Sequence, residues 1–157
     1  MYYVIRKLKQ EEVKILDKFL YEAIFIPKGV EAPPMEIINR PELRVYVDGF
    51  GTKNGDICFV VETNGLIVGA VWIRIMNDYG HIDDETPSFA ISLLKEYRGN
   101  GIGTELMKRM LAELKACQYK KASLAVQKQN YAVRMYKNVG FEIADENEAE
   151  YIMVCRL

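Results

Sequence analysis

Hydrophobic and polar residues along this chain alternate with two periods, one near 2 and one near 3.6 residues. The first is typical of a strand with one buried face, and the second of an amphipathic helix. Strands are expected at 3–7, 57–63, 66–75, 89–94, 121–126, 141–144 and 151–156. Helices are expected at 10–25, within 35–47, up to about 116 after a glycine-rich turn, and at 130–139. The order β-α-α-β-β-β-α-β-α-β-β predicts a mixed α/β fold.

Two segments stand out in this pattern. Asn64-Gly65 separates two apolar segments, and both residues tolerate positive φ, so a type I′ hairpin turn is expected there. The segment 27–34 is rich in proline and glycine and has no clear period. It is therefore expected to be irregular.

The glycine-rich turn carries the strongest chemical signal. Residues 97–104 read Tyr-Arg-Gly-Asn-Gly-Ile-Gly-Thr, between an apolar strand and a helix. Bare main-chain amides and the helix dipole at such a place suit a phosphate or pyrophosphate. No lysine follows Gly103, which excludes a Walker loop, and the glycine spacing excludes a dinucleotide fingerprint. There remain the pattern Arg98-x-x-Gly101-x-Gly103 and the alternative that the glycines only cap the helix.

Length and composition narrow the possible functions. A chain of 157 residues is the usual size of one domain, expected here over 1–157. The net charge of −1 does not favour nucleic acid, and no apolar segment approaches the roughly 20 residues of a membrane span. The three separated cysteines and single histidine favour no disulfide framework and no metal site, and a reducing cytoplasm fits them.

The pattern Arg98-x-x-Gly101-x-Gly103 resembles motif A of the GCN5-related N-acetyltransferases (GNAT), which binds the pyrophosphate of acetyl-CoA. Downstream, Asn130, Tyr136 and Gly140-Phe141 resemble motif B of the same family, with Ala132 one position before its commonest place. The resemblance implies the GNAT acyl-CoA N-acyltransferase fold, a mostly antiparallel, splayed sheet of about seven strands with about four helices. It also implies acetyl-CoA as co-substrate and no metal.

The resemblance further implies where the cofactor binds. The strand backbone near residue 93 would hydrogen-bond the pantetheine arm, and the amides of the turn would bind the pyrophosphate. For Arg98 the alternative is packing beside the turn, and for Asn130 it is capping the next helix. The expected cofactor-binding residues are Ile91, Leu93, Leu94, Arg98, Gly99, Asn100, Gly101, Ile102, Gly103, Thr104, Asn130 and Tyr136.

Acyl transfer to an amine also needs proton transfers and a stabilised oxyanion. Tyr136 occupies the motif B tyrosine position and is the candidate general acid for the departing thiolate, and an amide near Leu93 is the candidate oxyanion donor. Relatives often carry a glutamate base at the position of Ser88, and because serine cannot act as a base unaided, the resemblance does not identify the base of this chain. His81 and Glu85 are the base candidates, with Asp83 and Asp84 as neighbouring alternatives; an amine already deprotonated in solution is a further possibility.

Acidic residues give one indication of the acceptor. Segments 78–85 and 142–150 carry four and five acidic residues, and acidic walls would attract a cationic amine such as a polyamine, an aminoglycoside or a basic peptide. The alternative is that both are solvated loops. The expected partner is a small-molecule or peptide amine, with no nucleic acid or membrane, and the chain acts as a monomer or homodimer. The rival functions are a non-catalytic acyl-CoA-binding module and a nucleotide-binding interaction domain.

Overall fold

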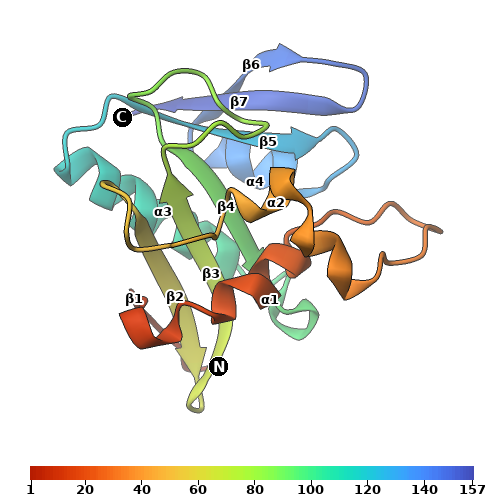
Figure 1. The fold of residues 1–157 in the computed structure, drawn as a ribbon, viewed down its shortest axis with the longest axis vertical. Coiled ribbons are helices and arrows are strands. Elements are labelled where there is room, and N and C mark those ends of the chain that lie inside the picture. Colours follow the sequence, from red (N-terminus) through yellow and green to blue (C-terminus); the bar gives the residue numbers. More distant parts are fainter.

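Seven strands form a single sheet in the computed structural model, which describes residues 1–157 (Figure 1). Their order across the sheet is β1-β2-β3-β4-β5-β7-β6, and every neighbouring pair is antiparallel except β4 and β5. The strands are β1 (Val4–Lys7), β2 (Ile57–Thr63), β3 (Leu66–Arg74), β4 (Ser88–Leu93), β5 (Lys121–Gln127), β6 (Phe141–Glu146) and β7 (Glu150–Arg156).

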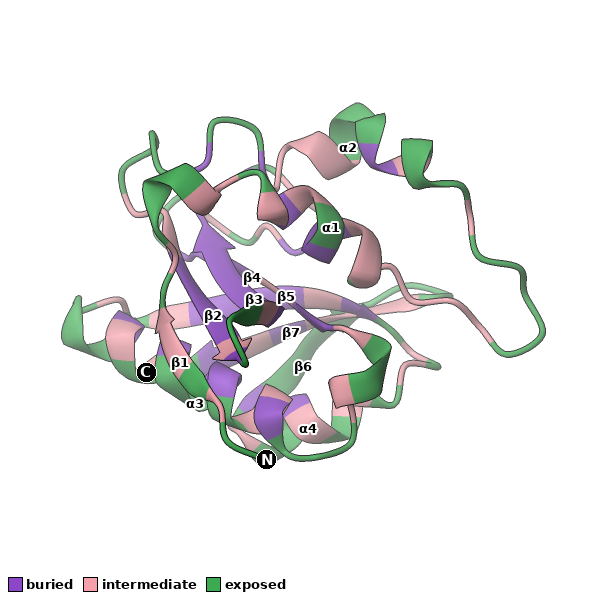
Figure 2. Cartoon of the chain, turned by 90° about the horizontal axis from the view of Figure 1, so that it is seen from below, coloured by how far each residue is buried: buried purple, intermediate pink, exposed green.

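Four α-helices cover the two faces of this sheet. They are α1 (Ile15–Glu22), α2 (Pro41–Arg44), α3 (Ile102–Ala116) and α4 (Ala132–Asn138), joined by 3-10 turns at Gln10–Glu12, Met35–Asn39 and Lys95–Tyr97. Helices α1 and α2 lie on one face, and α3 and α4 on the other (Figure 2). Each face has its own apolar core: Leu16, Phe19 and Trp72 belong to the first, and Met107 and Phe141 to the second.

The sheet is split between its two parallel strands. Only Ser88 of β4 and Ser123 of β5 are paired, and beyond them the strands diverge (Figure 1). We call this divergence the fork, with its closed end at Ser88 and Ser123. The mixed α/β fold with a splayed seven-stranded sheet and four helices is therefore confirmed, as is the hairpin, where Asn64 and Gly65 have φ of 51° and 78°.

Two element predictions were wrong. The expected helix 10–25 is a 3-10 turn followed by α1, because the Glu12 carboxylate accepts a hydrogen bond from the Lys9 amide (2.9 Å) and is held by Arg6, which fixes a separate first turn. The expected strand 141–144 continues to Glu146 as β6, so the acidic segment 142–150 is a loop only in part. Acidic residues gave no sign of this extension, which depends on pairing with β7.

Replacing Glu12 by glutamine tests the ion pair that fixes the first turn. The Arg6 guanidinium, 2.8 Å away, and the Lys9 amide lower the pKa of Glu12 to about 2. A lowered folded-state pKa contributes stability above the unfolded value, and this contribution is lost as the pH falls from about 4.3 toward 2. We expect Glu12→Gln to lower the free energy of unfolding by at most about 1 kcal/mol at pH 7, because the ion pair is partly exposed. The free energy of unfolding of the variant should also fall less steeply as the pH is lowered. Urea unfolding at several pH values measures both; Glu11→Gln, an exposed neighbour without an ion pair, should leave this pH dependence unchanged.

Candidate functional site

The turn before α3 presents a row of free amides. Gly99 and Gly101 have φ of 79° and 81°, a conformation that residues with a side chain rarely adopt. The N–H groups of residues 99–104 donate no hydrogen bond within the chain, and the first helical bond runs from Glu105 to the Gly101 carbonyl (3.2 Å). Since the positive end of the α3 dipole lies at the same place, this row is suited to a multiply charged anion.

The third glycine of the turn has a different role. Gly103 has an ordinary φ, but a Cβ there would lie 3.2 Å from the Met135 sulfur on α4. The absence of a side chain thus lets the start of α3 approach α4. The pattern of glycines therefore serves both the bend of the turn and close packing, rather than capping alone.

One edge of β4 is free beside this turn. The Leu94 amide donates to the Val68 carbonyl of β3 (2.9 Å), and hydrogen-bonding directions alternate along a strand, so Ile91 and Leu93 direct their amides toward β5. Beyond the closed end of the fork these amides have no partner on β5. An extended ligand can pair with them as an added strand. Leu94 cannot contribute in this way, because Tyr97 also donates to its carbonyl (2.9 Å), which corrects the expectation for that residue.

Arg98 is engaged by the protein itself. Its Nε donates to the Leu93 carbonyl (2.9 Å), and its Nη2 donates to the Glu22 carbonyl (3.3 Å) at the end of α1. The Glu22 carboxylate lies 3.7 Å from the same nitrogen. Arg98 therefore joins the end of α1 to the end of β4. No sequence pattern indicated Glu22, since 76 positions separate the two residues.

A cleft of about 780 Å³ brings most of the expected cofactor residues together. It is bordered by the end of α1 and the segment from residue 23 to residue 32, by β4 at Ile91 and Leu93, and by the glycine turn. The start of α4 closes it, where Asn130 and Tyr136 line the wall. The Asn130 side chain accepts a hydrogen bond from the Ala132 amide (2.9 Å), so it caps α4 at the edge of the cleft.

Tyr136 reaches the cleft from the apolar core. Its ring is 8% exposed and packs edge-on against Phe141, with ring centroids 6.1 Å apart. Its hydroxyl donates no hydrogen bond within the chain. The hydroxyl oxygen is nevertheless not fully buried, and because Tyr136 lines the cleft, the hydroxyl is accessible from it. Burial raises the pKa of Tyr136 above its ordinary value, which keeps the hydroxyl protonated and able to donate.

The structure does not bring the two base candidates to this cleft. His81 lines a different cavity, of about 870 Å³, with Glu142 and Asp145 of β6, and its Nδ1 lies 2.8 Å from the Met76 carbonyl. Glu85 is exposed and lines neither cavity. Neighbouring acids are paired with lysines, Asp83 with Lys121 at 3.5 Å and Glu146 with Lys128 at 2.8 Å. The two acidic segments, 78–85 and 142–150, therefore do not form a wall of this cleft.

Two further features bear on the type of site. No group of three histidine, cysteine or acidic side chains is arranged to hold a metal ion. No helix combines the length and the apolar character that crossing a bilayer requires.

Comparison with known proteins gives one family and one fold. Residues 24–141 match the model of the acetyltransferase (GNAT) family. The PaiA N-acetyltransferase of Thermoplasma acidophilum, solved in complex with coenzyme A, superposes with a TM-score of 0.73 at 18% identity, covering 100% of both chains.

Two other solved structures share this fold. A putative acetyltransferase of Salmonella typhimurium with its cofactor acetyl-CoA gives a TM-score of 0.69 at 17% identity, over 100% of this chain and 95% of the other. A spermidine N-acetyltransferase chimera from Vibrio cholerae gives 0.66 at 19%, over 99% and 96%. No curated protein sequence matches the chain significantly.

Proposed function

Since the chain belongs to the GNAT acetyltransferase family, we propose that it transfers an acetyl group from acetyl-CoA to a primary amine. The observation that carries this proposal is the row of unpaired amides at 99–104 beside the free edge of β4. A diphosphate bound by the first and a pantetheine arm paired with the second would place a thioester in the fork. We take residues 1–157 to form one domain that acts in the cytoplasm as a monomer or homodimer.

The proposed reaction is direct transfer through a tetrahedral intermediate. The amine nitrogen attacks the thioester carbonyl, and the Ile91 amide, which faces the fork two residues before Leu93, stabilises the oxyanion. Collapse of the intermediate breaks the C–S bond, and the Tyr136 hydroxyl supplies a proton to the departing sulfur. Burial supports this role because it keeps that hydroxyl protonated at neutral pH.

We propose a cationic amine as the acceptor. Support comes from the spermidine N-acetyltransferase of the same fold. The test is release of coenzyme A thiol from acetyl-CoA with polyamines, aminoglycosides, basic peptides and acidic amino acids. Release with a cationic amine supports the proposal, and turnover confined to acidic amino acids would reverse the choice of acceptor. Binding of acetyl-CoA without thiol release from any amine would favour a non-catalytic acyl-CoA-binding module.

Substituting Gly101 by alanine should weaken acetyl-CoA binding. A side chain at φ 81° costs roughly 1–2 kcal/mol, which the chain relieves by moving the amides that hold the diphosphate. We expect the dissociation constant, measured by calorimetry, to rise by about tenfold. Gly65→Ala is the matched control, because Gly65 has φ 78° and a Cβ added there, as at Gly101, would meet no atom within 4 Å outside its own chain neighbours. The control should lower Tm without changing affinity; equal affinities for all three proteins would contradict the site.

A further inference from the structure

One buried carboxylate oxygen has no partner in this protein. Asp78 Oδ2 is the single buried side-chain nitrogen or oxygen atom without a hydrogen bond, while Asp78 Oδ1 accepts one from the Ser88 hydroxyl (2.9 Å). No cationic side chain forms an ion pair with Asp78. An unpaired buried polar atom costs about 1–3 kcal/mol, and more when it is charged, so its presence requires an explanation.

Asp78 is fixed at the closed end of the fork. Ser88, its hydrogen-bond donor, is the residue of β4 that pairs with Ser123 of β5. The Ser123 hydroxyl donates to the Gly80 carbonyl (2.7 Å), and a Cβ on Gly80 would lie 3.0 Å from the Ala125 amide. The segment 78–80 therefore lies directly on β5, and the position of the carboxylate is set by both strands.

The reactive end of a bound cofactor points toward this carboxylate. Strand β4 runs from Ser88 to Leu93, next to the glycine turn, and its six residues span roughly 17 Å. A ligand whose diphosphate is held by residues 99–104 and whose arm pairs with the Leu93 amide extends along β4 away from the turn. Its far end therefore approaches the closed end of the fork.

Asp78 and Tyr136 lie on opposite faces of β4; Tyr136 lines the cleft, whereas Asp78 lines neither cavity and its Oδ2 is buried. The Ser92 hydroxyl donates to the Phe19 carbonyl of α1 (2.7 Å), so by alternation Ser88 is on the α1 face of β4. Tyr136 belongs to the core of the other face, where it packs against Phe141, which in turn packs against Phe89. A base on one side of a thioester and an acid on the other is the arrangement that amine attack and thiol departure require.

The Tyr46 hydroxyl is close to Asp78 on the same side. Burial, then the negative charge of Asp78 and a side-chain hydrogen-bond contribution from Asp78, raise the pKa of Tyr46 above its ordinary value. The charges of two other groups, Tyr79 and Glu150, raise the pKa of Tyr46 in the same direction and supply no cation. An incoming amine is thus the cation that this cluster lacks.

We propose that Asp78 is the catalytic base, which binds the acceptor ammonium through Oδ2 and removes the proton whose loss frees the nitrogen for attack; this proposal rests on the proposed function. Asp78 takes one proton from the bound ammonium, which frees the nitrogen lone pair to form the bond to the carbonyl carbon; the second proton passes from nitrogen to solvent, and the C–S electron pair leaves with sulfur. Sulfur then takes a proton from Tyr136. Proton exchange with solvent restores both residues, and Ser88 acts as a positioning residue.

Replacement of Asp78 by asparagine tests this assignment, because the amide has the same shape and no basic oxygen. With the amine that gives the highest wild-type rate, we expect kcat to fall by about 100-fold or more, with KM for acetyl-CoA within about threefold. Glu42→Gln, an exposed carboxylate without an ion pair, is the control and should keep the wild-type rate. The proposal is overturned if kcat of Asp78→Asn stays within threefold of wild type. A fall in kcat in His81→Gln or Glu85→Gln would then identify the base instead.

A binding measurement separates this proposal from the proposed function. Coenzyme A carrying an aminopropyl group on sulfur should bind wild type more tightly than coenzyme A carrying a propyl group, and Asp78→Asn should abolish that preference while keeping the affinity for the propyl compound. If wild type turns over no amine, the proposed function fails, and this comparison still decides the role of Asp78 in binding the amine. The role of Asp78 is overturned if wild type does not prefer the aminopropyl compound, or if Asp78→Asn keeps that preference.

Discussion

Replacing Tyr136 by phenylalanine is expected to lower kcat by at least about tenfold, because it removes the proton donor for the departing thiolate. The change should leave the cleft intact. The aromatic ring, which packs against Phe141, is retained, and the hydroxyl makes no hydrogen bond within the chain that its loss would break. Steady-state thiol release gives kcat, and calorimetry with acetyl-CoA gives an affinity that should change little.

The control for this variant is Tyr119→Phe. Tyr119 is a half-buried tyrosine that lies outside the cleft, so its hydroxyl should be dispensable for turnover. An unchanged kcat in Tyr136→Phe would remove Tyr136 from the mechanism. A loss of kcat in both variants would point to a general effect of these substitutions on the fold.

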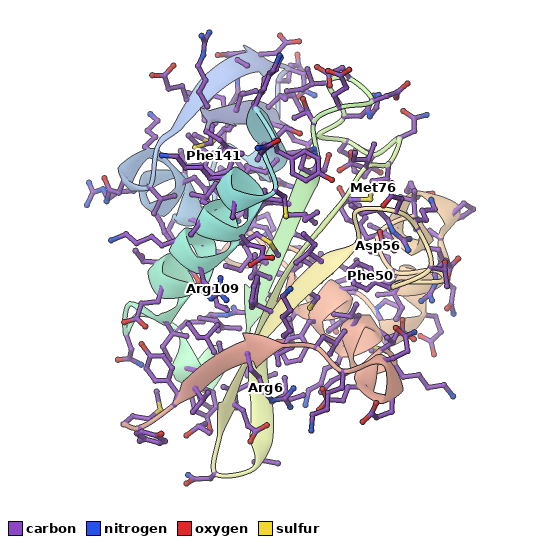
Figure 3. The ribbon with its side chains drawn as sticks, turned by 90° about the vertical axis from the view of Figure 1, so that its left-hand side faces the viewer. Arg6, Phe50, Asp56, Met76, Arg109 and Phe141 are labelled. Carbon is purple, nitrogen blue, oxygen red and sulfur yellow. The ribbon has the colours of Figure 1, made fainter.

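Replacing Asp56 by alanine is expected to cost about 3–5 kcal/mol of unfolding free energy, because it leaves a buried guanidinium uncompensated. Arg74 and Asp56 are each 1% exposed and form two hydrogen bonds of 3.0 Å. Arg74 also donates to the Val45 and Asp48 carbonyls (3.0 and 2.7 Å) and lies over the Phe50 ring. Figure 3 shows Asp56 and Phe50 next to each other, on the far side from Phe141.

Urea unfolding, with the midpoint and slope measured for each protein, tests this prediction. Asp48→Ala is the matched control, because its carboxylate is 64% exposed and pairs with Arg44 at the surface, a contact worth about 0–1 kcal/mol. A similar small loss in both variants would mean that Arg74 is satisfied without Asp56. The result also bears on the site, since Arg74 holds the segment that carries Tyr46.

Local patterns in the sequence predicted the elements that depend on neighbouring residues. The hairpin at Asn64-Gly65 and the turn at Gly99 and Gly101 were predictable because each requires positive φ, which few residue types allow. The first helix was predicted too long, because the turn at Glu12 depends on its contact with Arg6 as well as on the Lys9 amide. Strand β6 was predicted too short, at 141–144, because its acidic end is held by pairing with β7.

The sequence by itself determined the glycine turn and the order of the elements, because these follow from short-range periodicity and conformational preference. Tyr136 and Asn130 were indicated only by the resemblance to motif B. Only the tertiary structure decided that the Ile91 and Leu93 amides are free, that Arg98 is bound to Glu22, and that His81 lies outside the cleft. It also placed the Asp78 carboxylate on Ser88, where the sequence showed only a serine in place of the frequent glutamate. These outcomes depend on which strands separate and which loops cross them, and such long-range contacts have no signature in any local pattern.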